Sequence, residues 1–320
     1  MLEIPFALLC LVLGSSRCDA KDQCYAQTVR ELTNSKYFGT ALSVVTALSF
    51  ASLSIFGKLS QTLHMPSSNL LFWRFLIAGL ILMAFTWQTP ISRKTRLLLF
   101  TFGVFYFVQT AVYFAALERI SAGTTSLLLY LAPAFVVLYQ RILFGKRPKL
   151  EQLLAIGLSL VGLLVILGLP TERDKNVLGL FLAVATGAMY GAYLTASERL
   201  LAGIPAFVVT AHTSLASAIG FAFYAATRNE LRAPNSSLEW ALVAGIVIVP
   251  TLIAIPAMFA SIGKIGASRA SILFTLEPAF VLLIAAVWLG EPLGFSQLLG
   301  GGLILASAIL AQLPGKTSSS

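Results

Sequence analysis

The chain has 320 residues, of which 58% are hydrophobic and only 11% are charged. Soluble domains carry about 25% charged residues, so this composition excludes a soluble globule and indicates a chain that lives in lipid. The formal charge of +9 comes from 22 Lys and Arg against 13 Asp and Glu. No basic run is interleaved with aromatic residues, so the excess does not indicate a nucleic-acid partner.

Residues 1–38 are predicted to form an N-terminal cytoplasmic segment. Its apolar stretch Ile4–Gly14 has 11 residues and is too short to span a bilayer. It resembles a signal-peptide core, although no Lys or Arg precedes it, and an interfacial anchor or an over-long start are the other interpretations. Cys10, Cys18 and Cys24 lie in this segment with no His nearby, so no metal site is predicted.

Ten apolar segments follow, each close to the roughly 20 residues that a membrane-spanning helix needs. Lipid requires backbone groups to be satisfied within each segment, so the spans are predicted to be helices. The breaks between them are short and leave no room for a soluble domain. The predicted spans are Gly39–Leu59, Asn69–Trp87, Leu97–Leu117, Ser121–Phe144, Leu150–Leu169, Val177–Ala196, Ile204–Thr227, Leu242–Ile262, Ala267–Leu289 and Phe295–Leu313.

The distribution of Lys and Arg predicts the orientation of these spans. With the N-terminus inside, 15 of the 22 basic residues lie on the cytoplasmic side and 6 on the other, and Arg74 lies within a span. Both termini are therefore predicted to be cytoplasmic, in an integral protein of the plasma (inner) membrane. The same distribution argues against a cleaved signal peptide, which would start the first helix outside.

An internal repeat appears when the sequence is shifted by 145 residues. Tyr130–Leu158 then aligns without a gap to Thr275–Leu303, and Pro133–Val136 matches Pro278–Val281. The repeat divides the ten helices into two sets of five.

The two predicted repeats cover residues 39–170 and 177–313, and residues 314–320 form a short cytoplasmic tail. Five is an odd number, so the second half must enter the membrane upside down. The charges agree, because the basic loop Gly145–Lys149 corresponds to Gly290–Gly294, which has no basic residue. The predicted fold class is an all-α integral membrane protein with ten transmembrane helices in a 5+5 inverted repeat, an architecture typical of transporters.

These features resemble the EamA-type ten-helix transporters of the drug/metabolite transporter superfamily. The likeness covers about residues 39–313 and rests on Pro133, on Leu276-Glu277-Pro278, on the pair Gly290-Glu291, on a Gly-rich last helix and on Arg74. It implies a central cavity lined by helices one to four and six to nine, with helices five and ten at the periphery. It says little about the substrate.

Glu277 is the sharpest functional candidate. The ninth span starts at Ala267, which places Glu277 roughly 15 Å deep, near the midplane. A charge there costs about 2.5–3.5 kcal/mol, so an intramembrane acid suggests substrate binding or proton coupling. The structural alternative is that protonated Glu277 satisfies a carbonyl freed by Pro278, although Ala132 occupies the equivalent position of the first half.

The first half offers the remaining candidates for substrate binding. Arg74 lies roughly 7–8 Å from the outer end of the second helix, where it could bind an anionic group or snorkel to the interface. Tyr106, Gln109 and Tyr113 share one face of the third helix and could line a cavity or bond to neighbouring helices. Trp73 in the second helix is a further candidate.

Tyr190 in the sixth helix is a further substrate-binding candidate, in the second half. Four prolines are predicted to kink or gate their helices. Pro133 and Pro278 are related by the repeat, whereas Pro250 and Pro256 in the eighth helix have no counterpart in the third.

The leading functional hypothesis is a secondary transporter that exports a small organic metabolite or drug-like solute by alternating access, with proton coupling as an option. No GxxxxGK[ST] loop is present, so ATP is not predicted to drive it directly, and no cofactor is predicted. A membrane enzyme would need clustered His, Asp or Cys, and a channel or scaffold would not need the inversion. The expected partners are the small solute and the lipid bilayer, and a homodimer is left open.

Overall fold

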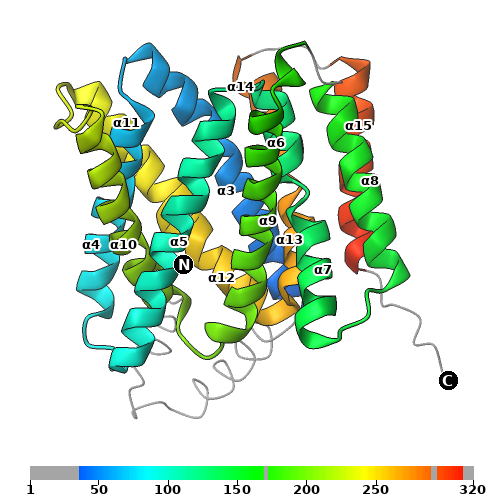
Figure 1. The fold of residues 1–320 in the computed structure, drawn as a ribbon, viewed down its shortest axis with the longest axis horizontal. Helices are drawn as coiled ribbons and strands as arrows, with labels where there is room; N and C mark the ends of the chain where they lie inside the picture. Colours follow the sequence, from blue (N-terminus) through cyan, green and yellow to red (C-terminus); the bar gives the residue numbers. More distant parts are fainter. Residues whose placement is uncertain (1–35, 169–171, 290–293, 313–320) are drawn as a thin grey trace, which may run out of the picture.

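The computed structural model describes residues 36–168, 172–289 and 294–312. Ten helical spans in these ranges are long and apolar enough to cross a membrane, which confirms the predicted all-α multi-pass architecture. Figure 1 shows them standing side by side, with connections at the upper and lower faces. Residues 1–35 of the predicted N-terminal segment, which include the three cysteines, the pair Gly290-Glu291 and the tail 314–320 lie outside the described residues, whereas residues 36–38 belong to the first helix.

The spans begin and end close to the predicted residues. In chain order they are α3 (Lys36–Thr62), α4 (Ser67–Thr86), α5 (Arg93–Leu117), α6 (Ala122–Leu129) with α7 (Ala132–Phe144), α8 (Leu150–Leu167), α9 (Val177–Leu200), α10 (Ala206–Thr227), α11 (Ser237–Val247) with η2 (Ile248–Ile253) and α12 (Ala254–Ile265), α13 (Ala267–Phe274) with α14 (Glu277–Leu289), and α15 (Phe295–Gln312). A short 3₁₀ turn, η1 (Glu172–Lys175), precedes α9.

Three spans differ from continuous α-helices. The fourth and ninth are each two helices separated by two residues, Tyr130-Leu131 and Thr275-Leu276. The eighth begins at Ser237, five residues before the predicted start at Leu242, and contains the π-helical turn η2 around Pro250. Proline removes a backbone donor in each of these regions, so a regular ladder of hydrogen bonds cannot pass through them.

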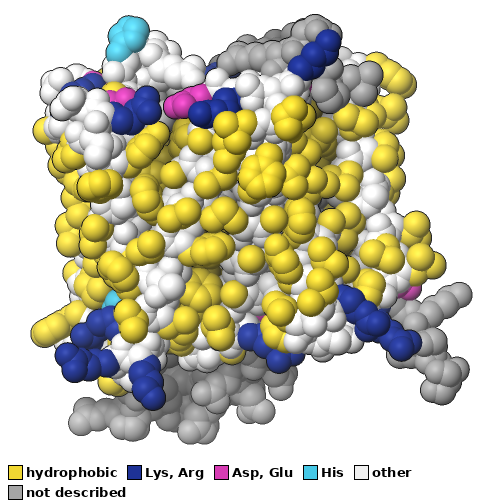
Figure 2. All heavy atoms as spheres, viewed as in Figure 1, with side chains coloured by type: hydrophobic (Ala, Val, Ile, Leu, Met, Phe, Trp, Pro, Cys, Tyr) yellow, Lys and Arg dark blue, Asp and Glu magenta, His cyan; other side chains and the backbone are white. Residues whose placement is uncertain are grey.

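The outer surface of the bundle is apolar. Figure 2 shows hydrophobic side chains over the middle of the visible face and Lys and Arg at its upper and lower edges. Large apolar side chains such as Phe181, Phe223 and Ile309 are more than half exposed. A soluble protein would not leave such a band uncovered, whereas lipid tails would cover it.

Close helix packing depends on glycines. A Cβ at Gly103 of α5 would lie 2.6 Å from the Ala216 Cβ on α10. Gly162 of α8 and Gly300 of α15 face each other, so that a Cβ on either would lie within 2.7 Å of the other's carbonyl oxygen. Small residues let helix backbones approach in this way within membranes.

The 145-residue repeat recurs in the helix boundaries. The first and last residues of α6, α7 and α8, shifted by that interval, are the first and last residues of α13, α14 and α15. In Figure 1, α6 lies above α7 whereas α13 lies below α14, and α8 packs beside α15. Inversion of the complete second half stays a prediction.

Candidate functional site

A cavity of about 550 Å³ lies within the bundle. Its lining reaches Ser67, the first residue of α4, and Leu167, the last residue of α8, and both helix ends lie at the upper face in Figure 1. In the opposite direction the lining ends at residues such as Leu194 of α9 and Ser271 of α13. The cavity therefore extends from the upper face into the middle of the bundle.

Most of the lining is apolar or aromatic. Its aromatic side chains are Phe50, Phe75, Tyr106, Tyr113, Phe114, Tyr130, Tyr190, Tyr193 and Phe274. Among the described residues of the lining, three side chains carry a charge or an amide, namely Arg74, Gln109 and Glu277. A pocket with an apolar wall and a few polar groups can enclose an organic solute and fix its orientation.

Both interrupted spans contribute to the cavity at their breaks. Tyr130 and Pro133 line it at the break between α6 and α7, and Thr275 and Pro278 line it at the break between α13 and α14. Helices that stop within the bundle present backbone groups without intrahelical partners, and discontinuous helices form the solute sites of many transporters. Two of the four prolines that the sequence identified as kinks, Pro133 and Pro278, thus lie at helix breaks in the wall of the cavity.

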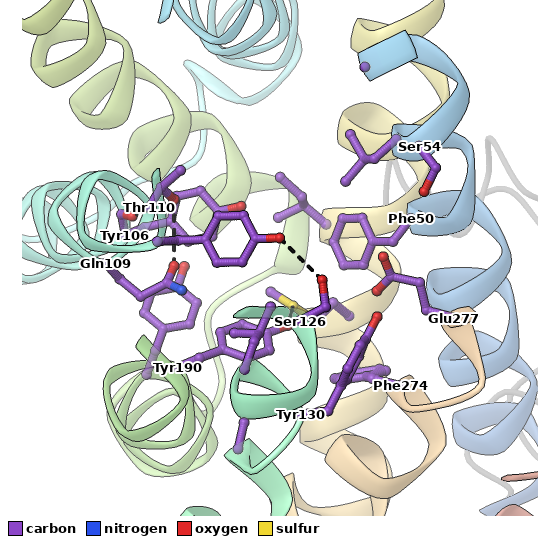
Figure 3. A pocket seen from close by; sticks show the side chains of 18 of the residues that line it. Phe50, Ser54, Tyr106, Gln109, Thr110, Ser126, Tyr130, Tyr190, Phe274 and Glu277 are labelled. Atoms are coloured by element: carbon purple, nitrogen blue, oxygen red, sulfur yellow. Dashed lines mark hydrogen bonds between the residues drawn. The ribbon is translucent and has the colours of Figure 1, made fainter. Parts of the chain in front are cut away.

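Glu277 is the first residue of α14 and faces the cavity. Figure 3 shows its carboxyl group and the Tyr130 hydroxyl pointing toward one another, with Phe50 of α3 and Phe274 of α13 nearby. The positive end of a helix dipole favours an acid at this position, while the aromatic neighbours oppose a charge. Glu277 therefore lies at a helix N-terminus in an otherwise aromatic part of the cavity wall.

Arg74 lies in the wall of the cavity, and its side chain does not snorkel, because only 3% of the residue is exposed. Its Nε donates to Thr251 Oγ1 at 2.8 Å, and one terminal nitrogen donates to the Pro250 carbonyl oxygen at 2.9 Å. A guanidinium has five N–H donors, so these two bonds leave donors that a solute could use.

The π-helical turn supplies the acceptors for Arg74. Pro250 has no N–H to donate to the Ile246 carbonyl, and Thr251 Oγ1 donates to that oxygen at 2.8 Å instead. The Ala254 N–H donates to the carbonyls of Thr251 and Val249, three and five residues back, rather than to that of Pro250. The Pro250 carbonyl is thus released from the usual helical pairing and accepts from Arg74.

The polar face of α5 lies where the sequence predicted it. Tyr106, Gln109 and Tyr113 all line the cavity, together with Thr110. The Tyr113 hydroxyl lies 3.4 Å from Ser126 Oγ on α6, the contact drawn to Ser126 in Figure 3. The Tyr106 ring packs edge-on against Phe75. This face of α5 therefore both lines the cavity and contacts a neighbouring helix.

Tyr190 of α9 also lines the cavity, and its hydroxyl lies 3.7 Å from Met258 Sδ. Pro250 and Pro256 are buried in the eighth span and do not line the cavity. Pro250 acts on the site indirectly, through the π-helical turn that binds Arg74.

Trp73 lies outside the cavity, contrary to the prediction. Its indole Nε1 donates to the Arg232 carbonyl at 2.9 Å, and its ring packs edge-on against Trp240 of α11. Trp73 therefore lies on the face of α4 that packs against α11, whereas Arg74 lies on the face that lines the cavity.

Several lining residues were missed from sequence. Tyr193 is 4% exposed and packs against Phe102, Tyr106 and Phe259. It lies three residues after Tyr190, a spacing that places both on one face of α9 and could have been recognised. Tyr130, at the helix break, gave no comparable signal.

Nine of the ten spans contribute to the lining described here. The tenth, α15, contributes none of these residues, as the family resemblance implied. The fifth, α8, is not wholly peripheral, because its last two residues, Ile166 and Leu167, reach the cavity.

The fold and the cavity define a polytopic membrane protein with an internal solute-sized site. Residues 37–168 and 177–313 each match the EamA-like transporter family, and the chain belongs to that family. Its named relatives are transporters rather than enzymes, which confirms the membrane-transporter prediction.

Two relatives and one solved structure illustrate the likeness. An uncharacterized transporter of Archaeoglobus fulgidus is 28% identical, with 86% of this chain and 96% of that protein aligned. The threonine/homoserine exporter RhtA of Escherichia coli is 24% identical, with 77% of this chain and 82% of that protein aligned. A solved crystal structure at 23% identity has a TM-score of 0.74 and covers 87% of this chain and 99% of that chain, which shows the same fold.

Proposed function

We propose that the protein is a secondary transporter that exports a small organic solute with an anionic group, by alternating access across the plasma membrane. Both termini lie in the cytoplasm in this proposal, and the second half is inverted relative to the first. The observation that carries it is the cavity, which joins an apolar aromatic wall to the Arg74 guanidinium and the Glu277 carboxyl.

The anionic group is assigned to Arg74. Its guanidinium is held in place by Thr251 and Pro250 and retains donors for a carboxylate or a similar group. A cation buried among apolar groups is costly without a counter-charge, and an anionic solute would supply one. The positive N-terminal ends of α7 and α14 at the helix breaks also favour a negatively charged group.

Glu277 is assigned to proton coupling or to binding a cationic group on the solute. A solute with both an anionic and a cationic group would satisfy Arg74 and Glu277 together, and amino acids have this chemistry. The relative RhtA is named as a threonine/homoserine exporter, which supports amino-acid-like solutes as the first class to test.

The experiment is substrate-dependent flux in vesicles that contain the purified protein. Vesicles are loaded with one labelled amino acid at a time, and efflux is followed with and without a proton gradient. Counterflow against unlabelled solute separates a carrier from a channel, because only a carrier exchanges one solute for another. If none of a broad set of amino acids and related anions moves while a control transporter works, the proposed function is wrong.

A further inference from the structure

A second hollow of about 470 Å³ lies at the opposite face of the bundle. It is formed where α7 and α9 end and where α8 and α13 begin, at the lower face in Figure 1. Four basic side chains line it, Lys146, Arg147, Lys149 and Arg269, against the acids Glu151 and Glu198. This face carries the basic loop Gly145–Lys149 that the sequence places in the cytoplasm.

Only about one helical turn separates this hollow from the central cavity. On α9, Leu194 lines the cavity and Glu198 lines the hollow, a separation of about 6 Å along the helix axis. On α13, Ser271 lines the cavity and Ser268 lines the hollow, about 4.5 Å apart on the same basis. The two cavities are therefore nearly continuous, and a thin layer of side chains divides them.

The Glu198 carboxylate binds three groups within that layer. It accepts from Gln140 Nε2 at 2.7 Å, from Lys146 Nζ at 2.8 Å and from the Ala267 backbone N–H at 2.9 Å. Gln140, which is 7% exposed, continues the chain, because its Oε1 accepts from Ser268 Oγ at 2.8 Å. We call these five residues the Glu198 cluster.

The cluster joins the two halves of the chain. Gln140 and Lys146 belong to α7 and the loop after it. Glu198 lies in the last turn of α9, and Ala267 and Ser268 begin α13. These bonds can form only while the ends of α7, α9 and α13 lie together. Breaking the three bonds to Glu198 would free three donors and one carboxylate to meet water or an incoming solute.

We infer that the lower hollow is the cytoplasmic entrance of the transport path and that the Glu198 cluster is its closed gate. The inference rests on the proposed function, because a gate between two cavities has a purpose only in a transporter. The structure then represents the state open toward the upper face. The basic lining draws a solute with an anionic group to the entrance. Such a group can replace Glu198 as the acceptor for Lys146, Gln140 and the Ala267 N–H, which opens the gate.

The test measures access to a reporter cysteine from each side of the membrane. The reporter is Ser271→Cys, one turn above the gate, in a variant whose three native cysteines are replaced by serine. A membrane-impermeant maleimide is added to right-side-out and to inverted vesicles. In the parent variant, labelling should be faster from the face opposite Glu198. Adding Glu198→Ala should shift the ratio of the two labelling rates about tenfold toward the Glu198 face.

Two further variants keep the test decisive if Glu198→Ala fails to insert. Glu198→Gln retains an acceptor for the Ala267 N–H but loses the ion pair with Lys146, and Lys146→Ala removes the partner instead. Both should shift the ratio in the same direction by a smaller factor. Glu118→Ala removes an exposed acid from the opposite end of the bundle and should leave the ratio unchanged.

The outcome separates this inference from the proposed function, since labelling needs no substrate. An unchanged ratio in all of the inserted Glu198 and Lys146 variants would overturn the gate, even if flux is observed. A shifted ratio without flux of any solute would support the gate while the proposed substrate class fails.

Discussion

Arg74 of α4 donates from Nε to Thr251 Oγ1 in the π-helical turn of the eighth span, at a distance of 2.8 Å. The bond links the two halves of the chain beside the cavity. The same hydroxyl donates to the Ile246 carbonyl, so one threonine repairs the helix at Pro250 and holds the guanidinium. The position of the Arg74 guanidinium therefore depends on Thr251, and the position of the Thr251 hydroxyl depends on the carbonyl that Pro250 leaves free.

Thr251→Val should destabilise the protein, because valine has nearly the same shape but leaves both the Ile246 carbonyl and the Arg74 Nε–H without this partner. Unsatisfied buried groups cost about 1–3 kcal/mol, which should appear as a lower Tm in detergent or nanodiscs. Thr101→Val is the matched control, because Thr101 is exposed and its hydroxyl only bonds back to Leu97. An equal loss of Tm in both variants would contradict this account.

Arg74→Lys should impair transport even though the charge is retained. A lysine ammonium lacks the planar fork that reaches Thr251 and Pro250 together while presenting further donors to a solute. We expect kcat/KM for flux to fall by about tenfold or more, on the scale of a lost charge-assisted hydrogen bond. Arg228→Lys, at the exposed end of α10, should retain flux, and normal flux in Arg74→Lys would remove Arg74 from the substrate site.

Glu277→Gln should abolish the pH dependence of transport while the protein still inserts and folds. A carboxyl that couples proton entry to solute export must bind a proton from one side and release it to the other, and glutamine can do neither. Flux should be compared between about pH 5.5 and about pH 8, with Glu118→Gln as the control. Normal flux across this pH range in Glu277→Gln would contradict both the proton and the cation role and leave only the structural role, in which the side chain supports the break at Pro278.

Gly103→Ala should loosen the contact between α5 and α10. The new methyl group would meet the Ala216 Cβ at 2.6 Å, and Ser217 Oγ already bonds to the Gly103 carbonyl at 2.9 Å, so the helices cannot close without strain. Overpacking of this kind costs about 1–3 kcal/mol. Gly157→Ala on α8, where a Cβ meets nothing within 4 Å, should keep or slightly raise the Tm; thermal unfolding of the two variants provides the comparison.

Most of the fold could be predicted from the sequence because each span is a mostly apolar run between charged or turn-forming residues. Helix starts such as Leu150 and Val177 were predicted at the observed residue. The breaks at Pro133 and Pro278 were also indicated, since proline cannot continue a helical ladder. The sequence did not indicate that each of these spans consists of two separate helices. That depends on which neighbouring groups bond to the backbone groups left unpaired at the break.

The candidate site was only partly predictable. Residue type and helical spacing identified Glu277 and the polar face of α5, because such groups are rare in an apolar span. The partners of Arg74 could not be found this way, since Thr251 lies 177 residues away and its position depends on the π-helical turn. The incorrect assignment of Trp73 came from residue type alone, without regard to the face of α4 on which it lies.

The edge-on pair of Trp73 and Trp240, with ring centroids 5.6 Å apart, has a practical consequence. The pair spans the seam between α4 in the first half and α11 in the second, and the Trp73 indole is anchored to the Arg232 carbonyl. Indole emission responds to the polarity and proximity of its neighbours. Once Trp87 and Trp288 are replaced, the emission of this pair can be used to follow relative movement of the two halves without attaching a dye.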